Sequence, residues 1–255
     1  GTDRIRARCW EPENRDPIAV VQLSHGIIEH IERSNDFACF LAENGFIVVG
    51  NDHLGHGSSA GSENGYGYFA EKDGWNCVVK DIRQLYQMTK KQHPDLPYFI
   101  MGHSMGSFLV RTYLIDYPEK LAGVILSGTG QPSPVQVRAG LAIIKAESLF
   151  GGLKRRSKTA HNLCIGAYNK KFKPNRTDSD WLSRDEASVD IKLKDPACNF
   201  IPTLSCYRDL LNGVKYIGNI NNMQKMNKDT PIYFFSGDHD PVGSMGKAVK
   251  TVYNN

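Results

Sequence analysis

Short runs of apolar and β-branched residues alternate, along the first half of the chain, with segments whose apolar residues recur at helical spacing. The runs are typical of buried strands, and the segments between them are typical of amphipathic helices. We expect strands at residues 18–23, 46–49, 98–101 and 121–126, helices at 33–43, 75–92 and 108–117, and a weaker edge strand at 4–10. Strands that alternate with helices form a parallel sheet. The pattern therefore predicts an α/β fold.

This alternation breaks after residue 130. Residues 131–229 show no convincing buried strand, and the segment predicts helices and loops. One apolar helix face, bounded by Pro196 and Gly213, is formed by Phe200, Leu204, Tyr207 and Leu211. A strand pattern returns at 231–235. We therefore predict a core at 1–130, a mainly helical cap at 131–229, and the rest of the core at 230–255. An insertion at this position would cover a site like a lid.

Composition limits the class of protein. With 255 residues, 40% of them hydrophobic, the chain can bury a large core as one domain, or as one domain with an insertion. The net charge of +4 is mild and the charges are interspersed, so no nucleic-acid partner is expected. No apolar run is long enough to span a bilayer, and the first residues, Gly1 to Arg4, are polar rather than signal-like. These features predict a soluble protein.

Cysteine and histidine spacing gives no metal-site signature. The six cysteines are scattered without a C-x-x-C pair, which predicts reduced, mostly buried thiols in a cytoplasmic protein. The stretch 51–59 is rich in Gly and His. His53 and His56 might be metal ligands, but no third ligand accompanies them at useful spacing. A tight loop beside an active site is the better interpretation, and we expect no metal and no cofactor.

The segment Gly102-His103-Ser104-Met105-Gly106 carries the main chemical signal. A bare G-x-S-x-G occurs by chance roughly 0.1 times in a chain of this length, so the pattern alone is weak. Here it lies between a predicted strand and a predicted helix, which is the context of a nucleophile elbow. Ser104 is the candidate nucleophile. Gly102 and Gly106 would give clearance where a Cβ would collide.

An activated serine needs an acid, a base and oxyanion donors. Asp240 follows the predicted strand 231–235, so its carboxylate would lie at the same sheet edge as Ser104. Asp238 is the alternative acid, and either aspartate could instead form a turn. The backbone N–H groups of Met105 and Ile27 are the predicted oxyanion donors.

The base is the missing member of this set. No histidine occurs among residues 241–255, and His239 adjoins Asp240, so it would rarely bridge that residue to a distant serine. His53, His56 and His103 precede the aspartate, against the order Ser, Asp, His of α/β-hydrolases. Two alternatives remain: either residues 1–255 end before the base, or the chain is not a competent hydrolase.

Three segments in order resemble the monoacylglycerol lipase family of α/β-hydrolases, which includes bacterial lysophospholipase-like members. Residues 24–30 resemble the oxyanion segment of that family, 52–58 its histidine-glycine loop, and 102–106 its elbow. Residues 185–195 and the helix to Leu211 resemble its cap, which implies an acyl-chain tunnel underneath. The resemblance implies an α/β-hydrolase fold, with a mostly parallel sheet flanked by helices and a helical cap.

The chain departs from the family pattern in two respects. Ser107 stands where members usually carry glycine, a small change that leaves the mechanism intact. Members also continue past the region of Tyr253 with a strand, a catalytic histidine and a final helix, and they usually have a strand before the Gly1–Asp3 turn. We therefore expect the histidine base to lie outside residues 1–255.

The function expected from these residues and this resemblance is hydrolysis of a lipid monoester, a monoacylglycerol or lysophospholipid, through an acyl-enzyme. A peptidase, amidase or thioesterase on the same fold is an alternative, and so is a lipid-binding protein without turnover. Residues 141–144 and 149–150 could line an acyl site or touch a membrane surface transiently, although core packing is the commoner fate of such residues. The basic residues 154–156 and 170–171 could attract anionic head groups or form a solvated face.

Overall fold

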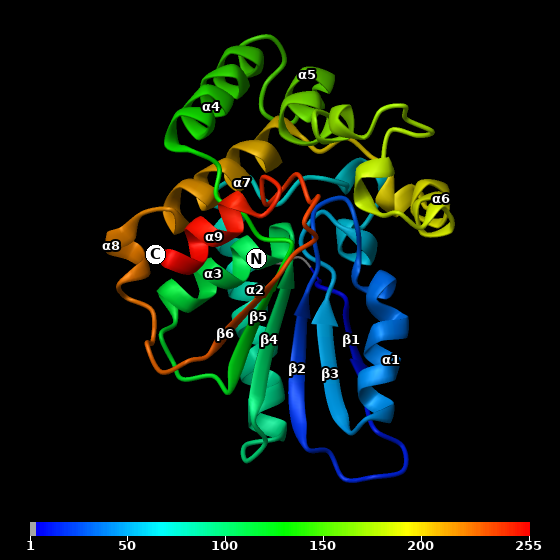
Figure 1. The fold of residues 1–255 in the computed structure, drawn as a ribbon, viewed down its shortest axis with the longest axis vertical. Helices are drawn as coiled ribbons and strands as arrows, with labels where there is room; N and C mark the ends of the chain where they lie inside the picture. Colours follow the sequence, from blue (N-terminus) through cyan, green and yellow to red (C-terminus); the bar gives the residue numbers. More distant parts are fainter. Residues whose placement is uncertain (1–3) are drawn as a thin grey trace.

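A computed structural model describes residues 4–255 and contains a six-stranded sheet (Figure 1). The strands are β1 (Ala7–Trp10), β2 (Ala19–Ser24), β3 (Phe46–Asn51), β4 (Tyr98–His103), β5 (Gly123–Ser127) and β6 (Ile232–Phe235). Their order in the sheet is β1-β3-β2-β4-β5-β6. All neighbours are parallel except β1, which pairs antiparallel with β3 at one edge. The predicted mostly parallel α/β sheet is confirmed.

The helices of the core follow the predicted alternation. They are α1 (Asn35–Glu43), α2 (Gly74–Gln92), α3 (Met105–Asp116) and, after β6, α9 (Lys247–Asn254). Between β5 and β6 the longer helices are α4 (Pro134–Ser148), α6 (Glu186–Lys194) and α7 (Leu204–Ile217), with the short helices α5 (Lys158–His161) and α8 (Ile220–Met223). Several single-turn segments, mostly 3-10, connect them.

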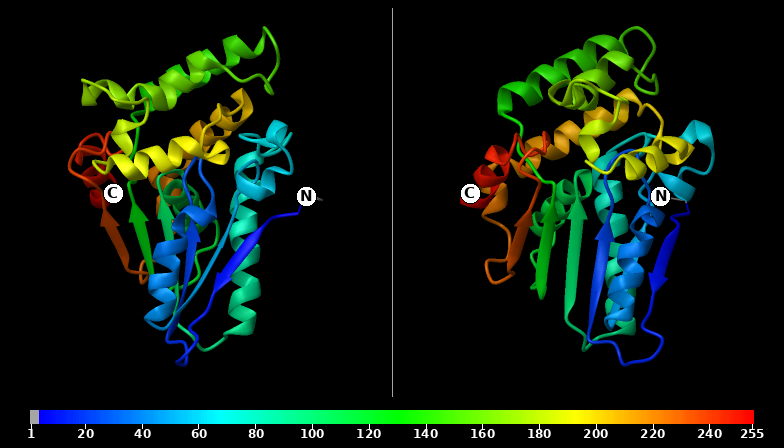
Figure 2. Two further views of the ribbon diagram at one scale, coloured as in Figure 1. Left: turned by 90° about the vertical axis from the view of Figure 1, so that its right-hand side faces the viewer. Right: turned by 45° about the vertical axis from the view of Figure 1, so that its right-hand side comes forward.

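Two apolar clusters lie on the two faces of the sheet, because successive strand residues point to opposite sides. On one face α1 packs over Trp10, Val21 and Leu23. On the other face α2 and α3 pack over Val20 and Ile47. Figure 2 shows α1 and α2 on opposite sides of the strands. The sheet is therefore a middle layer, and its carboxyl edge is free to carry loops.

Helices α4, α5 and α6 gather above this carboxyl edge, with α4 farthest from the sheet, whereas α8 lies to one side near α9 (Figures 1 and 2). Helix α7 contacts α2, α3 and α4, and its buried side chains Leu204 and Tyr207 belong to the same apolar cluster as Leu109 in α3. The segment thus shares its core with the sheet-forming part of the chain.

The predicted apolar face at residues 200–211 was wrong at both ends. Helix α7 begins at Leu204, because Pro202 disfavours helical backbone before it and the Thr203 side chain caps the helix by accepting from the Cys206 amide. Phe200 lies outside the helix and stacks on Tyr66, with ring centroids 5.0 Å apart. Gly213 does not end the helix. It makes room for Trp75, whose ring would lie 2.2 Å from an added Cβ.

Two other expectations concern exposure and the chain start. All six cysteines are free thiols, but only Cys198 and Cys206 are buried and Cys9 is exposed, so the prediction of mostly buried thiols was wrong. The expectation about Gly1 to Asp3 concerns positions outside the described residues. Across residues 4–255, no helix combines the length and apolar character needed to cross a bilayer.

Candidate active site

Ser104 occupies the sharp turn between β4 and α3. Its backbone has φ 51° and ψ −120°, a region that residues other than glycine rarely adopt. The turn is held by a hydrogen bond from the Ser104 amide to the Ser127 carbonyl at the end of β5, over 2.9 Å. A Cβ at Gly106 would lie 2.0 Å from the Ser24 carbonyl oxygen, and one at Gly102 would lie 2.5 Å from the Gly106 carbonyl oxygen. Both glycines are therefore required by close backbone approach.

The loop after β2 lies directly against this turn. Ser24 pairs with Gly102 in the parallel register of β2 and β4, so both strands end side by side. A Cβ at Gly26 would lie 3.3 Å from the Ser104 Cβ. The amides of Ile27 and Met105 donate no hydrogen bond within the described part of the chain. Two backbone amides without a hydrogen-bond partner among the described residues thus lie in the segments that flank Ser104, and their role as oxyanion donors stays a prediction.

Three histidines behind this loop are neutral and buried. His25 Nε2 accepts a hydrogen bond from the His53 amide over 2.9 Å, so its proton is on Nδ1, which donates to the Gly26 carbonyl over 2.7 Å. Burial lowers the pKa of His25 to about 4 and that of His56 to about 4, and it also holds the pKa of His53 well below its ordinary value. His53 and His56 therefore belong to a packed loop beside Ser104.

Asp240 lies beyond the end of β6. Its Oδ1 accepts from the Val242 amide over 2.9 Å, and its Oδ2 accepts from the Ser236 hydroxyl over 2.8 Å. Gly128, at the end of β5, separates it from His103: an added Cβ would lie 3.4 Å from Asp240 Oδ2 and 3.2 Å from His103 Cε1. Asp240 thus faces the end of β4. Asp238 is far more exposed, at 82%, and pairs with His239 over 2.9 Å.

No histidine among the described residues forms a hydrogen bond with the Ser104 hydroxyl. His103 points its Nδ1 to the Ser127 hydroxyl over 3.0 Å, and His239 is engaged with Asp238. The histidine base, expected outside residues 1–255, stays a prediction.

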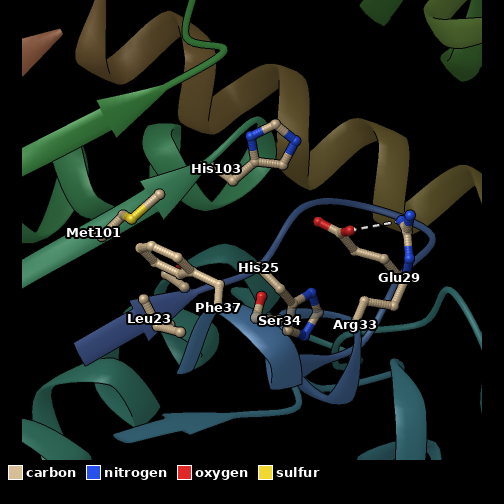
Figure 3. A pocket seen from close by; sticks show the side chains of 9 residues that line it. Leu23, His25, Glu29, Arg33, Ser34, Phe37, Met101 and His103 are labelled. Atoms are coloured by element: carbon tan, nitrogen blue, oxygen red, sulfur yellow. Dashed lines mark hydrogen bonds and ion pairs between the residues drawn. The ribbon is translucent and has the colours of Figure 1, made fainter. Parts of the chain in front are cut away.

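A cavity of about 180 Å³ opens beside the loop after β2 (Figure 3). Its apolar lining comes from Leu23, Phe37 and Met101, and its polar lining from Ser24, His25, Glu29, Arg33, Ser34 and His103. The dashed line in Figure 3 joins Glu29 to Arg33, whose Nη1 lies 3.0 Å from Glu29 Oε2. The polar end of the cavity therefore adjoins the candidate oxyanion loop.

The sequence pattern indicated no role for Glu29 or Arg33. Glu29 Oε1 accepts a short hydrogen bond from the Gly26 amide, and only 14% of its side chain is exposed. Burial raises the pKa of a carboxyl, but His103 and other neighbouring groups outweigh it and hold the pKa of Glu29 below its ordinary value. The sequence signal that could have indicated this contact was an acidic residue, Glu29, three positions after the glycine that follows the predicted strand.

One group of side chains could hold a metal ion within the described residues. His30, Asp195 and Cys198 bring ligand atoms within 4.8 Å of one another. Their local sequence spacing gave no sign of this, because His30 lies far from the other two in the chain. They are already joined by hydrogen bonds, 2.7 Å from His30 Nε2 to Asp195 Oδ2 and 3.6 Å from Cys198 Sγ to the same oxygen. These contacts link the 131–229 segment to the loop after β2.

The chain is similar in sequence to a known protein family and to several proteins. Residues 15–255 match the family model described as serine aminopeptidase, S33. Rat monoglyceride lipase is 28% identical over 211 residues, which cover 82% of this chain and 62% of the rat protein. The monoacylglycerol lipase of Mycolicibacterium smegmatis is 36% identical over 128 residues, covering 50% of this chain and 43% of that protein. The chain thus spans less than two thirds of the length of these relatives.

Solved structures show the same arrangement. A thermostable carboxyl esterase from Bacillus coagulans, crystallised with glycerol, superposes with a TM-score of 0.91 at 31% identity, covering 100% of this chain and 82% of that chain. A soluble variant of monoglyceride lipase from Saccharomyces cerevisiae superposes with a TM-score of 0.77 at 19% identity, covering 100% of this chain and 79% of that chain. At that identity the likeness is one of fold.

Proposed function

The chain belongs to the serine aminopeptidase S33 family of hydrolases, and from this membership we propose that the full-length protein is a serine carboxylester hydrolase of lipid monoesters. The substrate class is a monoacylglycerol or lysophospholipid. The observation that carries the proposal is the backbone of Ser104. Its φ of 51° is strained for a serine, and the segments that flank it carry two amides without a hydrogen-bond partner among the described residues.

Acylation uses three groups of the chain. The Ser104 Oγ attacks the ester carbonyl carbon, and its proton passes to the base. The carbonyl oxygen becomes an oxyanion, which the amides of Ile27 and Met105 stabilise by hydrogen bonds. The base then returns the proton to the alcohol as the C–O bond breaks, which leaves the acyl group on Ser104.

The base in this proposal is a histidine outside residues 1–255, as the family resemblance implies. Asp240 holds its tautomer and stabilises the imidazolium that forms. Asp240 is suited to this role because Ser236 and Val242 fix both carboxylate oxygens on the side that faces the β4 end. The same base activates a water molecule, which attacks the acyl-enzyme and releases the fatty acid.

Similarity to known enzymes supports a lipid monoester as the substrate. Several relatives are named monoglyceride or monoacylglycerol lipases, and the esterase that superposes at 31% identity was crystallised with glycerol. The free thiols support a reducing, cytoplasmic location for the protein.

The test is covalent labelling of the full-length protein with a fluorophosphonate probe, which reacts with a serine activated by a working base. We expect the wild type to be labelled, Ser104→Ala to be unlabelled, and the exposed-serine control Ser62→Ala to be labelled like the wild type. A folded full-length protein that resists the probe would overturn the proposal and leave lipid binding without turnover.

The family description favours one alternative, a peptidase or other amidase on the same fold. Purified full-length protein assayed against a monoacylglycerol, a lysophospholipid, an aminoacyl amide and an acyl thioester separates these functions. A kcat/KM highest for an ester agrees with the proposal, whereas preference for the amide or the thioester contradicts it.

We also propose that residues 131–229 form a cap that contacts a membrane surface transiently. Leu149 and Phe150, after the end of α4, are 77% and 81% exposed. Ile144 in the same helix is buried and packs in the core. Of the neighbouring basic residues, Arg156 donates to the carbonyls of Ile201 and Asn64, so its charge serves packing between segments. The apolar tip therefore carries this part of the proposal.

A further inference from the structure

Gly26 is held at both of its backbone polar groups by side chains of its own loop. Its carbonyl accepts from His25 Nδ1 over 2.7 Å, and its amide donates to Glu29 Oε1. The peptide unit that joins Gly26 to Ile27 is planar and trans, so the Ile27 N–H points away from the Gly26 carbonyl. Two anchors on Gly26 thus fix the direction of the Ile27 amide.

The carboxylate of Glu29 is itself held in place. Its second oxygen, Oε2, pairs with Arg33 one helical turn later over 3.0 Å. Between Gly26 and Glu29 the chain turns back through Ile28, which is buried and has φ 58°. A β-branched residue at positive φ is costly, and such a conformation persists only where its surroundings impose it. The bond from Gly26 to Glu29 closes this turn.

Glu29 also approaches the nucleophile. A Cβ built on Gly26 would lie 2.5 Å from Glu29 Oε1 and 3.3 Å from the Ser104 Cβ, so the carboxylate and the serine flank the same glycine. A negative charge this close to a forming oxyanion would oppose catalysis unless it were neutralised. The ion pair with Arg33 and the bond to the Gly26 amide supply that neutralisation.

We propose that Glu29 is a positioning residue. By accepting the hydrogen bond of the Gly26 amide, it fixes the loop so that the Ile27 amide is aligned as an oxyanion donor. The inference rests on the proposed function, because it assigns Glu29 a part in the same reaction. Glu29 acts through Gly26 and does not touch the reacting atoms. Its removal therefore weakens stabilisation of the transition state and leaves substrate binding nearly unchanged.

The test compares three variants of the full-length protein. Glu29→Ala removes the acceptor for the Gly26 amide, and we expect kcat to fall about 100-fold with KM changed less than about threefold, the scale of losing one oxyanion donor. Glu29→Gln keeps an acceptor oxygen and is expected to restore kcat to within about tenfold of the wild type. Glu32→Ala is the matched control, because its carboxylate pairs with Arg8 and not with the loop.

A second measurement follows the oxyanion directly. A trifluoromethyl ketone analogue forms a tetrahedral adduct with an oxyanion, so its affinity is expected to fall in Glu29→Ala in proportion to kcat. Should Glu29→Ala fail to fold, Glu29→Met keeps the volume without an acceptor, and the same comparison with Glu29→Gln applies.

The outcomes separate this inference from the proposed function. A wild type that fluorophosphonate does not label overturns the proposed function and this inference together. A labelled wild type with unchanged kcat in Glu29→Ala overturns the inference alone. A raised KM with unchanged kcat also overturns it, because Glu29 would then bind the substrate instead of positioning the loop.

Discussion

The Asp240 carboxylate accepts a hydrogen bond from the Ser236 hydroxyl over 2.8 Å. Ser236 follows directly after β6, so this bond ties the candidate acid to the carboxyl edge of the sheet, where β4 delivers Ser104. Asp238, two residues earlier, is exposed, and within residues 4–255 its carboxylate pairs with the neighbouring His239. The two aspartates therefore differ in what their replacement does.

Asp240→Asn is expected to lower kcat of the full-length protein by about 10⁴-fold, because the amide cannot hold a histidine in the tautomer that accepts the serine proton. Asp238→Asn is expected to change kcat less than about threefold. Steady-state kinetics on a soluble ester measures both variants. A larger effect at Asp238 would transfer the role of acid to that residue.

Gly213→Ala is expected to destabilise the protein, although alanine favours a helix by about 1 kcal/mol over glycine. The added Cβ would lie 2.2 Å from the Trp75 ring, and Trp75 is fixed by a hydrogen bond from its Nε1 to Thr112. Overpacking of this kind costs about 1–3 kcal/mol, so it outweighs the gain.

Gly140→Ala in α4 is the matched control, because its Cβ would meet only the flexible end of Leu211, at 2.8 Å. Denaturant unfolding of both variants gives the comparison. We expect the midpoint to fall for Gly213→Ala and to stay level or rise for Gly140→Ala. Equal shifts in the two variants would contradict the packing role of Gly213.

Stability is expected to decrease between pH 7 and pH 5, because the buried histidines resist protonation. The unfolded chain binds protons at these positions near pH 6.5, whereas burial lowers the pKa of His25 and His56 to about 4 in the folded state. The unfolded state therefore takes up more protons as the pH falls, and each ring costs roughly 2 kcal/mol by pH 5.

Thermal unfolding across this pH range is the measurement. His56→Gln is expected to reduce the slope of Tm against pH, and His239→Asn, at a position 69% exposed, is expected to leave it unchanged. A Tm that does not vary between pH 7 and pH 5 would show that the loop does not keep its histidines neutral.

Leu149 and Phe150 are expected to determine binding to lipid surfaces. Replacing both with glutamate removes the exposed apolar tip after α4 and adds charge that the bilayer interior rejects. Sedimentation with neutral phosphatidylcholine vesicles is expected to recover at least tenfold less of the double variant than of the wild type. Equal recovery would exclude this tip as the contact.

Much of the core could be predicted from local pattern. Strand and helix periodicity gave the parallel sheet, and the glycines around Ser104 indicated the elbow, because both signals lie within a few neighbouring residues. The two ends of helix α7 could not be predicted from local pattern. Its start depends on Thr203 as a cap after Pro202, and its passage through Gly213 depends on Trp75, which is distant in the chain.

The site contacts that were missed depend on register between segments. The proton on His25 Nδ1 follows from the His53 amide, which reaches His25 only because β2 and β3 pair in parallel. Gly128 matters because it follows β5 and lies between His103, at the end of β4, and Asp240, beyond the end of β6. Sequence alone indicates that such residues share an edge of the sheet, but not which atoms meet.

Helix α7 lies within residues 131–229, the segment predicted to be an insertion, yet it packs against α2 and α3 of the core. The segment is therefore not a portable module. A chimera that exchanged residues 131–229 for those of a relative would also have to carry the facing positions of α2 and α3. Because an added Cβ at Gly213 would lie 2.2 Å from the Trp75 ring, a larger residue at position 213 requires a smaller one at position 75, so changes in residues 131–229 are tied to changes in α2.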